Sequence, residues 1–376
     1  MIKLKNDAGC PLKRYQHGLR VAALVALALP AVAQTTGQPV ATLQQAPAVA
    51  FPNTTDSNSP AVWERIDGQW ILTVLNSVDG QTRLSRGPSV TTLQDYGPVS
   101  FTSAAPLGGY WFEALIQDAG AWYGFYHNEI AETVCGESGK VLPRIGAARS
   151  EDLGQTWTDL GLILELPPGE ELCDTLNHYF VGGVGDFSAL LDADSTYVHF
   201  YYSQYAEISE GVGVSAARMA WADRDEPRGR VEVWSDGAWL PARAISGVLP
   251  GEDDLWLQPL ATPVLPARDS WDNASPTVDV FWGPSVHWNT HINTYVMLLN
   301  RATSAEWEQG GIYVSYNDDL ANPDGWSTPV RLLSGGDWYP QVVGLGSGQA
   351  TDTYAGSPSR FFMSGRSEYT IRFERR

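Results

Sequence analysis

Short apolar strands separated by tight turns recur along the chain. Each unit has an apolar strand, a turn containing Gly or Asp, an aromatic strand, and a third strand that ends in polar or basic residues. The aromatic residue that opens the second strand lies ten positions after Pro60, Phe112 and Phe187 in the first three units. The five first strands are Ser59–Trp63, Phe112–Gln117, Phe187–Leu191, Pro284–Trp288 and Pro340–Val343. A shared offset indicates one repeated hairpin geometry.

These repeats predict the fold class. Beyond the N-terminal segment, no long stretch places apolar residues at the i, i+3, i+4 and i+7 spacing of an amphipathic helix. Four-stranded units stacked around an axis form a propeller, in which only short, protected sheet edges remain. The sequence therefore predicts an all-β, five-bladed β-propeller as a single domain over residues 51–376. A β-sandwich with coincidental similarity between its strands is the alternative.

The N-terminal segment has a different pattern. Basic residues precede the apolar run Val21–Leu29, and Ala31–Ala33 provides small residues before Gln34. This pattern predicts a secretory signal peptide over residues 1–33, with an uncleaved signal anchor as the alternative. Residues 34–50 are small and polar, and we expect them to be a flexible leader. The protein is therefore expected to be secreted, periplasmic or extracellular, and free of the membrane after cleavage.

Charge narrows the class of partner. The formal net charge is −19, and the signal segment carries five basic residues and one acid, which leaves about −23 on the remainder. Such a charge repels phosphate backbones and anionic lipids, so nucleic acid and membrane surfaces are not expected as partners. A neutral ligand is compatible with this negative charge. Nothing in the sequence predicts an obligate protein partner.

Two cysteines remain after the signal segment, Cys135 and Cys173. An oxidising compartment permits a bridge between them, but spacing alone does not decide whether they pair. Neither lies in a C-x-x-C spacing or beside a histidine, so no zinc site or thiol nucleophile is expected. The histidines show no metal-binding spacing either, and no metal or cofactor is predicted.

The segment Ser150–Trp157 matches the S-x-D-x-G-x-T-W Asp-box of sialidase-like propellers. Its Ser and Asp side chains are expected to hydrogen-bond the backbone of a hairpin turn, and its Gly to adopt a positive φ. We therefore interpret Asp152 as a structural residue of the blade.

The opening of each first strand is expected to face the propeller axis. The residues just before these strands' Pro or Phe are Ser59, Trp111, Asp186, Gly283 and Tyr339, and those two positions further on are Ala61, Glu113, Ser188, Ser285 and Gln341. Residues two apart share one side of a strand. Glu113 and Asp186 are thus the predicted acids of the channel, although Asp186 also suits a turn, and Glu113 would need solvent or an arginine such as Arg149.

Other residues are candidates for the same site. Asp56 precedes the first blade and either reaches the axis or caps a turn. His287 lies in the fourth unit and is either a site residue or a histidine packed within the strand. Flat aromatic rings stack on sugar faces, and the funnel-lining candidates are Trp111, Trp282, Trp288 and Tyr339.

Over nearly the whole chain after the signal segment, the blade pattern resembles the five-bladed superfamily of arabinanases, β-xylosidases, invertases and levansucrases, including glycoside hydrolase families 43, 32, 62 and 117. The segments Gly185–Ser188 and Gly283–His287 look like the D-P-S-x and E-G-P-x strand openings of those enzymes. The stretch from Ala216 to Asn289 also looks like a group of secreted bacterial propellers.

The resemblance implies a role for each matching residue. Asp56 corresponds to the base or nucleophile, although it stands four residues ahead of Pro60. Asp186 corresponds to the acid that orients the substrate and tunes pKa values. The general acid has no counterpart, because Trp282 stands where a Glu is expected; Asp279, Glu113 and His287 are the substitutes. The resemblance also leaves room for a structural calcium ion.

The leading hypothesis is therefore a secreted glycoside hydrolase-like protein that acts on a poly- or oligosaccharide in an axial pocket, with Asp56, Asp186, and Glu113 or His287 around the scissile bond. The missing acid before Gly283 keeps a non-catalytic carbohydrate-binding propeller as the alternative. A sialidase is the third hypothesis, but it needs an arginine cluster for the substrate carboxylate.

Overall fold

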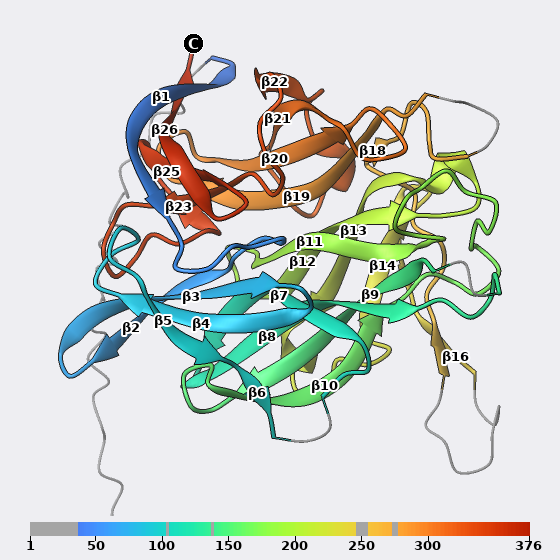
Figure 1. Ribbon diagram of the computed structural model, residues 1–376, viewed down its shortest axis with the longest axis horizontal. Coiled ribbons are helices and arrows are strands. Elements are labelled where there is room, and N and C mark those ends of the chain that lie inside the picture. The colour runs from blue at the N-terminus through green and yellow to red at the C-terminus, as the bar shows by residue number, and fades with distance from the viewer. Residues whose placement is uncertain (1–36, 103–104, 137–138, 246–254, 273–276) are drawn as a thin grey trace, which may run out of the picture. The chain divides into compact units, whose positions relative to one another are not determined.

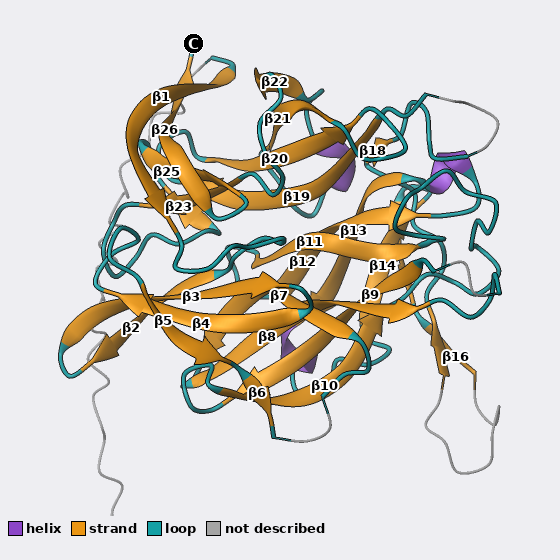
Figure 2. Ribbon diagram, viewed as in Figure 1, coloured by secondary structure: helices purple, strands orange, loops and turns teal. Residues whose placement is uncertain are grey.

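The computed structural model describes residues 37–376 except 103–104, 137–138, 246–254 and 273–276. The predicted signal peptide lies outside the described residues. The described residues form one compact unit. Almost all of its regular structure is strand, with three short 3₁₀ turns among the described residues (Figure 2). Within the described part of the chain, no helix is both long and apolar enough to cross a membrane.

The described residues form five sheets of at least four strands each, which are the five blades (Figure 1). Blades 1 and 2 consist of β2 Ala61–Ile66, β3 Gln69–Val78, β4 Gln81–Gly87 and β5 Gln94–Pro98, then β7 Gly109–Asp118, β8 Ala121–Ala131, β9 Val141–Ser150, β10 Thr156–Leu164 and β6 Ser100–Phe101. Blade 3 consists of β11 Gly183–Leu191, β12 Tyr197–Tyr205, β13 Gly213–Ala220, β14 Val231–Ser235 and β15 Ala238–Pro241, with β18 Leu265–Pro266 beside β13. Blades 4 and 5 consist of β19 Val280–Asn289, β20 Thr294–Ala302, β21 Gln309–Asn317, β22 Val330–Leu333 and β24 Tyr354–Ala355, then β23 Gln341–Gly344, β25 Ser359–Met363, β26 Arg366–Arg375 and β1 Pro39–Ala50. A separate hairpin pairs β16 Arg243–Ile245 with β17 Leu255–Leu257. The predicted five-bladed propeller is confirmed.

Two-residue turns join the first two strands of blades 1 and 2, as the sequence predicts. Asp67 and Gly68 have φ values of 50° and 80°, and Ala119 and Gly120 have 49° and 88°. Two successive positive φ values match the turn type whose twist suits a two-residue hairpin. These turns fix the register of the first hairpin in blades 1 and 2.

The ring closes through strand β1, which corrects the expected flexible leader. Residues 39–50 pair antiparallel with β26, from Pro39 opposite Arg375 to Ala50 opposite Arg366. Figure 1 shows the blue β1 beside the red β26. The segment lies on the outer edge of blade 5, where main-chain bonds hold a strand that buries few large side chains. Its small, polar composition therefore resembled that of a linker.

The hydrophobic core lies between neighbouring blades. Each interface has its own buried cluster, and the five clusters join blades 1–2, 2–3, 3–4, 4–5 and 5–1. Representative pairs are Leu75 with Trp157, Phe125 with Phe200, Tyr201 with Trp326, Val296 with Phe361, and Leu72 with Phe362. Burial of one such large side chain stabilises the fold by about 1.5–3 kcal/mol. The last cluster, between blade 5 and blade 1, makes the arrangement a closed ring.

The Asp-box residues hold the turn between β9 and β10. The carboxylate of Asp152 accepts hydrogen bonds from the amides of Gln155 and Thr156 and from the Thr156 hydroxyl. The Ser150 hydroxyl accepts one from the Gly154 amide at 2.9 Å. These are the turn contacts that the sequence predicts for Asp152.

A disulfide joins Cys135 to Cys173, with their Cα atoms 5.2 Å apart. The bridge connects the loop after β8 to the loop between β10 and β11. Those loops also carry Gly139, His178 and Tyr179, which line the cavity described below. The pairing that the sequence left open is thus present at the cavity rim.

Candidate active site

A cavity of about 470 Å³, here called the acid pocket, lies at one end of the inner strands. Four carboxylates line it: Asp56, Glu113, Glu129 and Asp186. The remaining lining is two histidines and a set of mostly aromatic side chains: His127, His178, Trp111, Gly139, Val141, Tyr179, Phe180, Trp282, Trp307, Trp338 and Tyr339. No lysine or arginine occurs among the described residues that line it.

β-Bulges at the openings of β7 and β11 aim the two innermost acids into this pocket. The pairing of β7 with β8 skips Glu113, between Phe112 and Ala114, and the pairing of β11 with β12 skips Asp186. A bulged residue is unpaired and turns its side chain away from the regular alternation. Asp186 also has a φ of 41°, an uncommon backbone conformation for a side chain other than Gly.

The bulges correct the alignment of the repeats. The sequence pattern predicts Trp111 as the counterpart of Asp186, but the skipped position on β7 is Glu113. The counterpart on β19 is Gly283–Pro284, skipped between Trp282 and Ser285. A bulge inserts one residue and so shifts the alternation of side chains along the strand. Counting from the first apolar residue therefore aligned Trp111 with Asp186, although Glu113 is the equivalent residue.

Glu113 is almost fully buried, with 3% of its surface exposed. Its Oε2 accepts a hydrogen bond of 2.6 Å from the Phe187 amide, and its Oε1 lies 3.9 Å from His127 Nδ1. Burial, together with the charge of Asp186, raises the pKa of Glu113 well above its ordinary value. Both effects favour the protonated form of this carboxyl group.

Asp186 lies beside Glu113 and accepts hydrogen bonds from two tyrosines. The Tyr205 hydroxyl is 3.1 Å from Oδ2, and the Tyr339 hydroxyl is 3.3 Å from Oδ1. Burial raises the pKa of Asp186, while His127 and these hydroxyls oppose the shift. Donors at both oxygens favour the ionised form, so Asp186 is the better-stabilised carboxylate of this pair.

Asp56 approaches from the loop before β2 and is less buried. Its Oδ1 accepts a 2.7 Å hydrogen bond from Trp111 Nε1, and its Oδ2 accepts a 3.3 Å bond from the Asp79 amide. Burial raises the pKa of Asp56, and both donors lower it. Asp56 therefore reaches the axial pocket as the sequence expects, and Trp111 holds its orientation.

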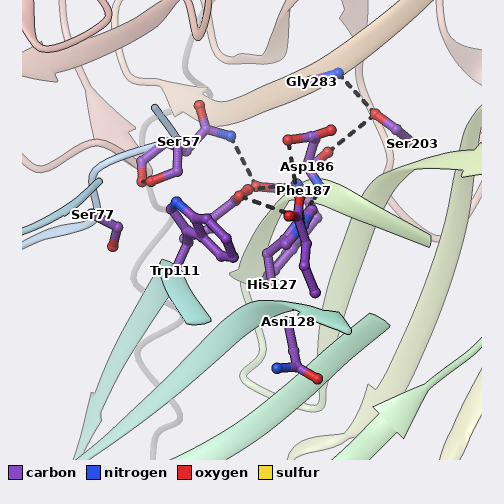
Figure 3. Close-up of polar contacts among 12 residues, drawn as sticks. Ser57, Ser77, Trp111, His127, Asn128, Asp186, Phe187, Ser203 and Gly283 are labelled. Carbon is purple, nitrogen blue, oxygen red and sulfur yellow. Dashed lines mark hydrogen bonds and ion pairs between the residues drawn. The ribbon is translucent and has the colours of Figure 1, made fainter. Parts of the chain in front are cut away.

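His127 contacts two of the acidic residues, Asp186 and Glu129, and Figure 3 shows it next to Asp186. The Asp186 amide donates to Nδ1 at 2.9 Å, and Nε2 lies 3.1 Å from a Glu129 oxygen. Burial lowers the pKa of His127, but the bond to Glu129 and the charges of Asp186, Glu129 and Glu113 raise it to about 9. A charged ring would carry a proton on Nδ1 and could not accept the bond from the Asp186 amide, so the geometry outweighs this shift and indicates a neutral ring. The ring proton lies on Nε2 and faces Glu129.

The same residues are the strongest candidate for a cation site. Ligand atoms of Glu113, His127 and Asp186 lie within 4.8 Å of one another. A cation on His127 Nδ1 would displace the Asp186 amide, and one Glu113 oxygen already accepts a bond from Phe187. Calcium takes six to eight oxygen ligands. The cluster does not fit that requirement, and no step is derived through a metal.

The aromatic wall of the pocket comes from blades 3 and 4 and their loops. Trp282 packs edge-on against Trp307, Trp338 and Tyr339, with ring centroids 4.8, 5.2 and 5.6 Å apart. Tyr179 packs edge-on against Trp307 at 5.8 Å. Trp282 itself is only 1% exposed, so Trp338 and Tyr179 offer more surface to a ligand.

The structure does not bring the remaining sequence-predicted residues to this pocket. His287 packs against Phe373 and lies near Asn289, and burial lowers its pKa to about 3. Arg149 pairs with Glu151 and Asp225 on the outside of blade 2. Trp288 lines a different cavity. These three assignments are corrected.

Asp279 is also excluded as a substitute acid, because both of its oxygens bind Arg301 at 2.7 and 2.8 Å. Among the histidines, the sequence predicts His287 as a site candidate and not His127, and it does not indicate Glu129, Tyr205, Trp307 or Trp338. The Ala119–Gly120 turn alone would pair Trp111 with Asn128, and the bulge at Glu113 shifts the register so that His127 lies opposite Trp111. The aromatic residues come from loops, where no periodic pattern indicates direction.

Comparison with known proteins gives similar folds at low identity. No family model matches the chain, and no curated protein matches it. An endo-arabinase from Bacteroides thetaiotaomicron VPI-5482 is 11% identical, with 86% of this chain and 96% of that chain covered and a TM-score of 0.49. A thermostable family-43 glycoside hydrolase is 13% identical, with 86% and 92% covered and a TM-score of 0.48.

A third similar structure is an exo-β-1,3-galactanase from Phanerochaete chrysosporium with β-1,3-galactotriose. It is 11% identical, with 87% of this chain and 64% of that chain covered and a TM-score of 0.46. Identities and TM-scores this low transfer no residue role, so the chemistry of the acid pocket rests on its own geometry.

Proposed function

We propose that this protein is a glycoside hydrolase that cleaves a neutral poly- or oligosaccharide in the acid pocket. The observation that carries the proposal is the convergence of Asp56, Glu113 and Asp186 in one cavity walled by aromatic side chains. Glycoside hydrolysis uses one carboxyl group as an acid and a second as a base or nucleophile. The pocket supplies carboxyl groups in unlike environments, which separates their roles.

Glu113 is the general acid of this proposal. Its raised pKa favours the protonated form, and Oε1 is the oxygen that accepts no bond from the Phe187 amide. The proton passes from Glu113 to the glycosidic oxygen as the bond to the anomeric carbon breaks. A positioned acid of this kind contributes about 10²–10⁴-fold in rate.

Asp56 is the base or nucleophile. Trp111 and the Asp79 amide hold it as a carboxylate at the more open side of the pocket. It takes the proton of the attacking water or attacks the anomeric carbon itself, and the anomer of the product distinguishes these two routes. Asp186 orients the sugar and, through its charge, raises the pKa of Glu113.

A neutral substrate fits the charge of the pocket. Four acids without a lysine or arginine among the described lining residues repel a uronate or sialate. A sialidase needs arginines for the substrate carboxylate, and Arg149 pairs with acids outside the pocket. This argument favours the neutral polysaccharide over the sialidase alternative.

The test is hydrolysis by the purified protein of arabinan, xylan, fructan, β-1,3-galactan and agar oligosaccharides. We expect release of sugar from at least one of them, and a loss of more than 100-fold in Asp186→Asn. Secretion is tested separately, by the N-terminal residue of the exported protein. Binding without turnover on every substrate would contradict this proposal and support a non-catalytic carbohydrate-binding propeller. That alternative is favoured by Trp282, which stands where a catalytic Glu is expected.

A further inference from the structure

A second cavity, of about 490 Å³, lies at the opposite end of the same inner strands; we call it the distal pocket. On β7 the acid pocket takes Glu113 and the distal pocket takes Leu115–Gln117; on β19 they take Trp282 and Trp288. Six residues of strand separate those two tryptophans, or about 20 Å. All five blades or their loops contribute to the distal pocket, so it is the other mouth of the propeller axis.

Buried hydrogen bonds close the axis between the two cavities. The amide group of Asn58 donates to the carbonyls of Phe187 and Pro284, at 2.9 and 3.0 Å. Ser59 and Gln341 exchange two bonds, and the Val286 amide donates to the Ser188 hydroxyl. The two pockets are therefore separate cavities and not two ends of one channel.

A row of three aromatic side chains crosses the distal pocket. Trp288 on β19 is paired directly with Tyr295 on β20 and with Tyr354 on β24. Directly paired residues share one face of a sheet, with strands about 4.8 Å apart. Trp288 and Tyr295 pack with ring centroids 4.8 Å apart, and Tyr354 is 49% exposed.

Polar groups without positive charge surround this row. Thr351, Thr353 and Gln117 add hydroxyl and amide groups, and Asp192 is the one charged residue among the described lining. Asp192 already accepts bonds from the Thr196 and Tyr197 amides. Aromatic faces combined with neutral hydrogen-bonding groups suit a neutral sugar, and the absence of a cation in that lining disfavours anions.

We propose that the distal pocket is a second, non-catalytic binding site for neutral oligosaccharide. Its ligand is another stretch of the polymer whose chain end enters the acid pocket, and this identification rests on the proposed function. The row Tyr295–Trp288–Tyr354 binds the sugar faces, and the threonine hydroxyls bind sugar hydroxyls.

The experiment is calorimetric titration of the Asp186→Asn protein with arabino-, xylo- and β-1,3-galacto-oligosaccharides. We expect two sites, of which one is weakened at least tenfold by Tyr354→Ala and by Trp288→Ala. Tyr96→Ala is the matched control, because Tyr96 is also exposed, at 61%, and lines neither pocket. Tyr354 is the decisive position, since its exposed side chain is dispensable for folding, as a thermal melt checks.

A single site that Trp111→Ala removes and Tyr354→Ala leaves intact overturns the proposal, as does no binding to any of the three sugars. Hydrolysis is measured separately in the wild-type protein. Two binding sites without hydrolysis would contradict only the proposed enzymatic function, and hydrolysis with a single binding site that Tyr354→Ala leaves intact would contradict only the distal site.

Discussion

The openings of β7 and β11 differ from the opening of β19 in what their bulges present to the axis. The first two present carboxylates, Glu113 and Asp186, whereas the third presents Gly283–Pro284. The resemblance in sequence implied an acid on blade 4, next to Gly283. The structure instead supplies the second inner acid from blade 2. The comparison teaches that a ring of equivalent positions allows one chemical group to come from a different blade.

The largest effect expected from this comparison is on catalysis. Glu113→Gln keeps the acceptor for the Phe187 amide but removes the transferable proton, so kcat/KM for a natural polysaccharide falls by about 10²–10⁴-fold. Ser285→Ala, beside the bulge of β19, serves as the control and loses less than tenfold. Steady-state assays measure kcat/KM for both variants. Equal losses in the two variants would contradict the claim that the catalytic acid comes from blade 2 and not from blade 4.

The backbone at the bulges gives the next effect. Gly283 has a φ of 56°, and a Cβ there would lie 2.7 Å from Asn300 Nδ2. Gly283→Ala is expected to destabilise the fold by about 1–3 kcal/mol. Asp186→Gly, at a φ of 41°, is expected to stabilise it by about 1 kcal/mol while abolishing activity. Urea denaturation of both proteins compares them, and a stabilised Gly283→Ala protein would refute the strain argument.

The raised pKa of Glu113 predicts a pH-dependent stability difference. Unfolded Glu titrates near pH 4.3, so below that pH both states hold the proton and the carboxyl contributes little. As the pH rises, the unfolded state ionises first, and the folded wild-type protein loses stability until the folded pKa is passed. Glu113→Gln should therefore gain melting temperature over wild type as pH rises above about 4. A difference independent of pH would show that Glu113 is ionised in the fold.

The smallest effect is expected at the rim of blade 2. Asp152→Ala removes the bonds to Gln155 and Thr156 and should cost about 1–2 kcal/mol of stability. Its kcat/KM should change less than twofold, since Asp152 lies in a turn between outer strands. Thermal melts and initial rates check this, and a large loss of activity in a folded protein would reassign the Asp-box.

The fold was predictable because each blade repeats its own hairpin signals, such as the turns at Asp67–Gly68 and Ala119–Gly120. Closure by β1 was not, since an edge strand held by main-chain bonds needs no large apolar side chain. Asp56, Glu113 and Asp186 were found from their positions at strand openings. The sequence pattern placed Trp288 at the same end of the axis as Trp282, whereas Trp288 lies at the opposite end of β19. Both ends of this strand carry a tryptophan, so composition does not show which end faces the acids. Predicting that His127 lies in the acid pocket requires knowledge of both the hairpin register and the bulge.

The most direct test of the account is the rate of Glu113→Gln on two substrates with the same sugar, a natural disaccharide and a dinitrophenyl glycoside. A leaving group that needs no proton bypasses the general acid. We predict a loss of at least 100-fold on the disaccharide and less than tenfold on the dinitrophenyl glycoside. Equal losses on both substrates would contradict the assignment of Glu113 as the acid of this pocket.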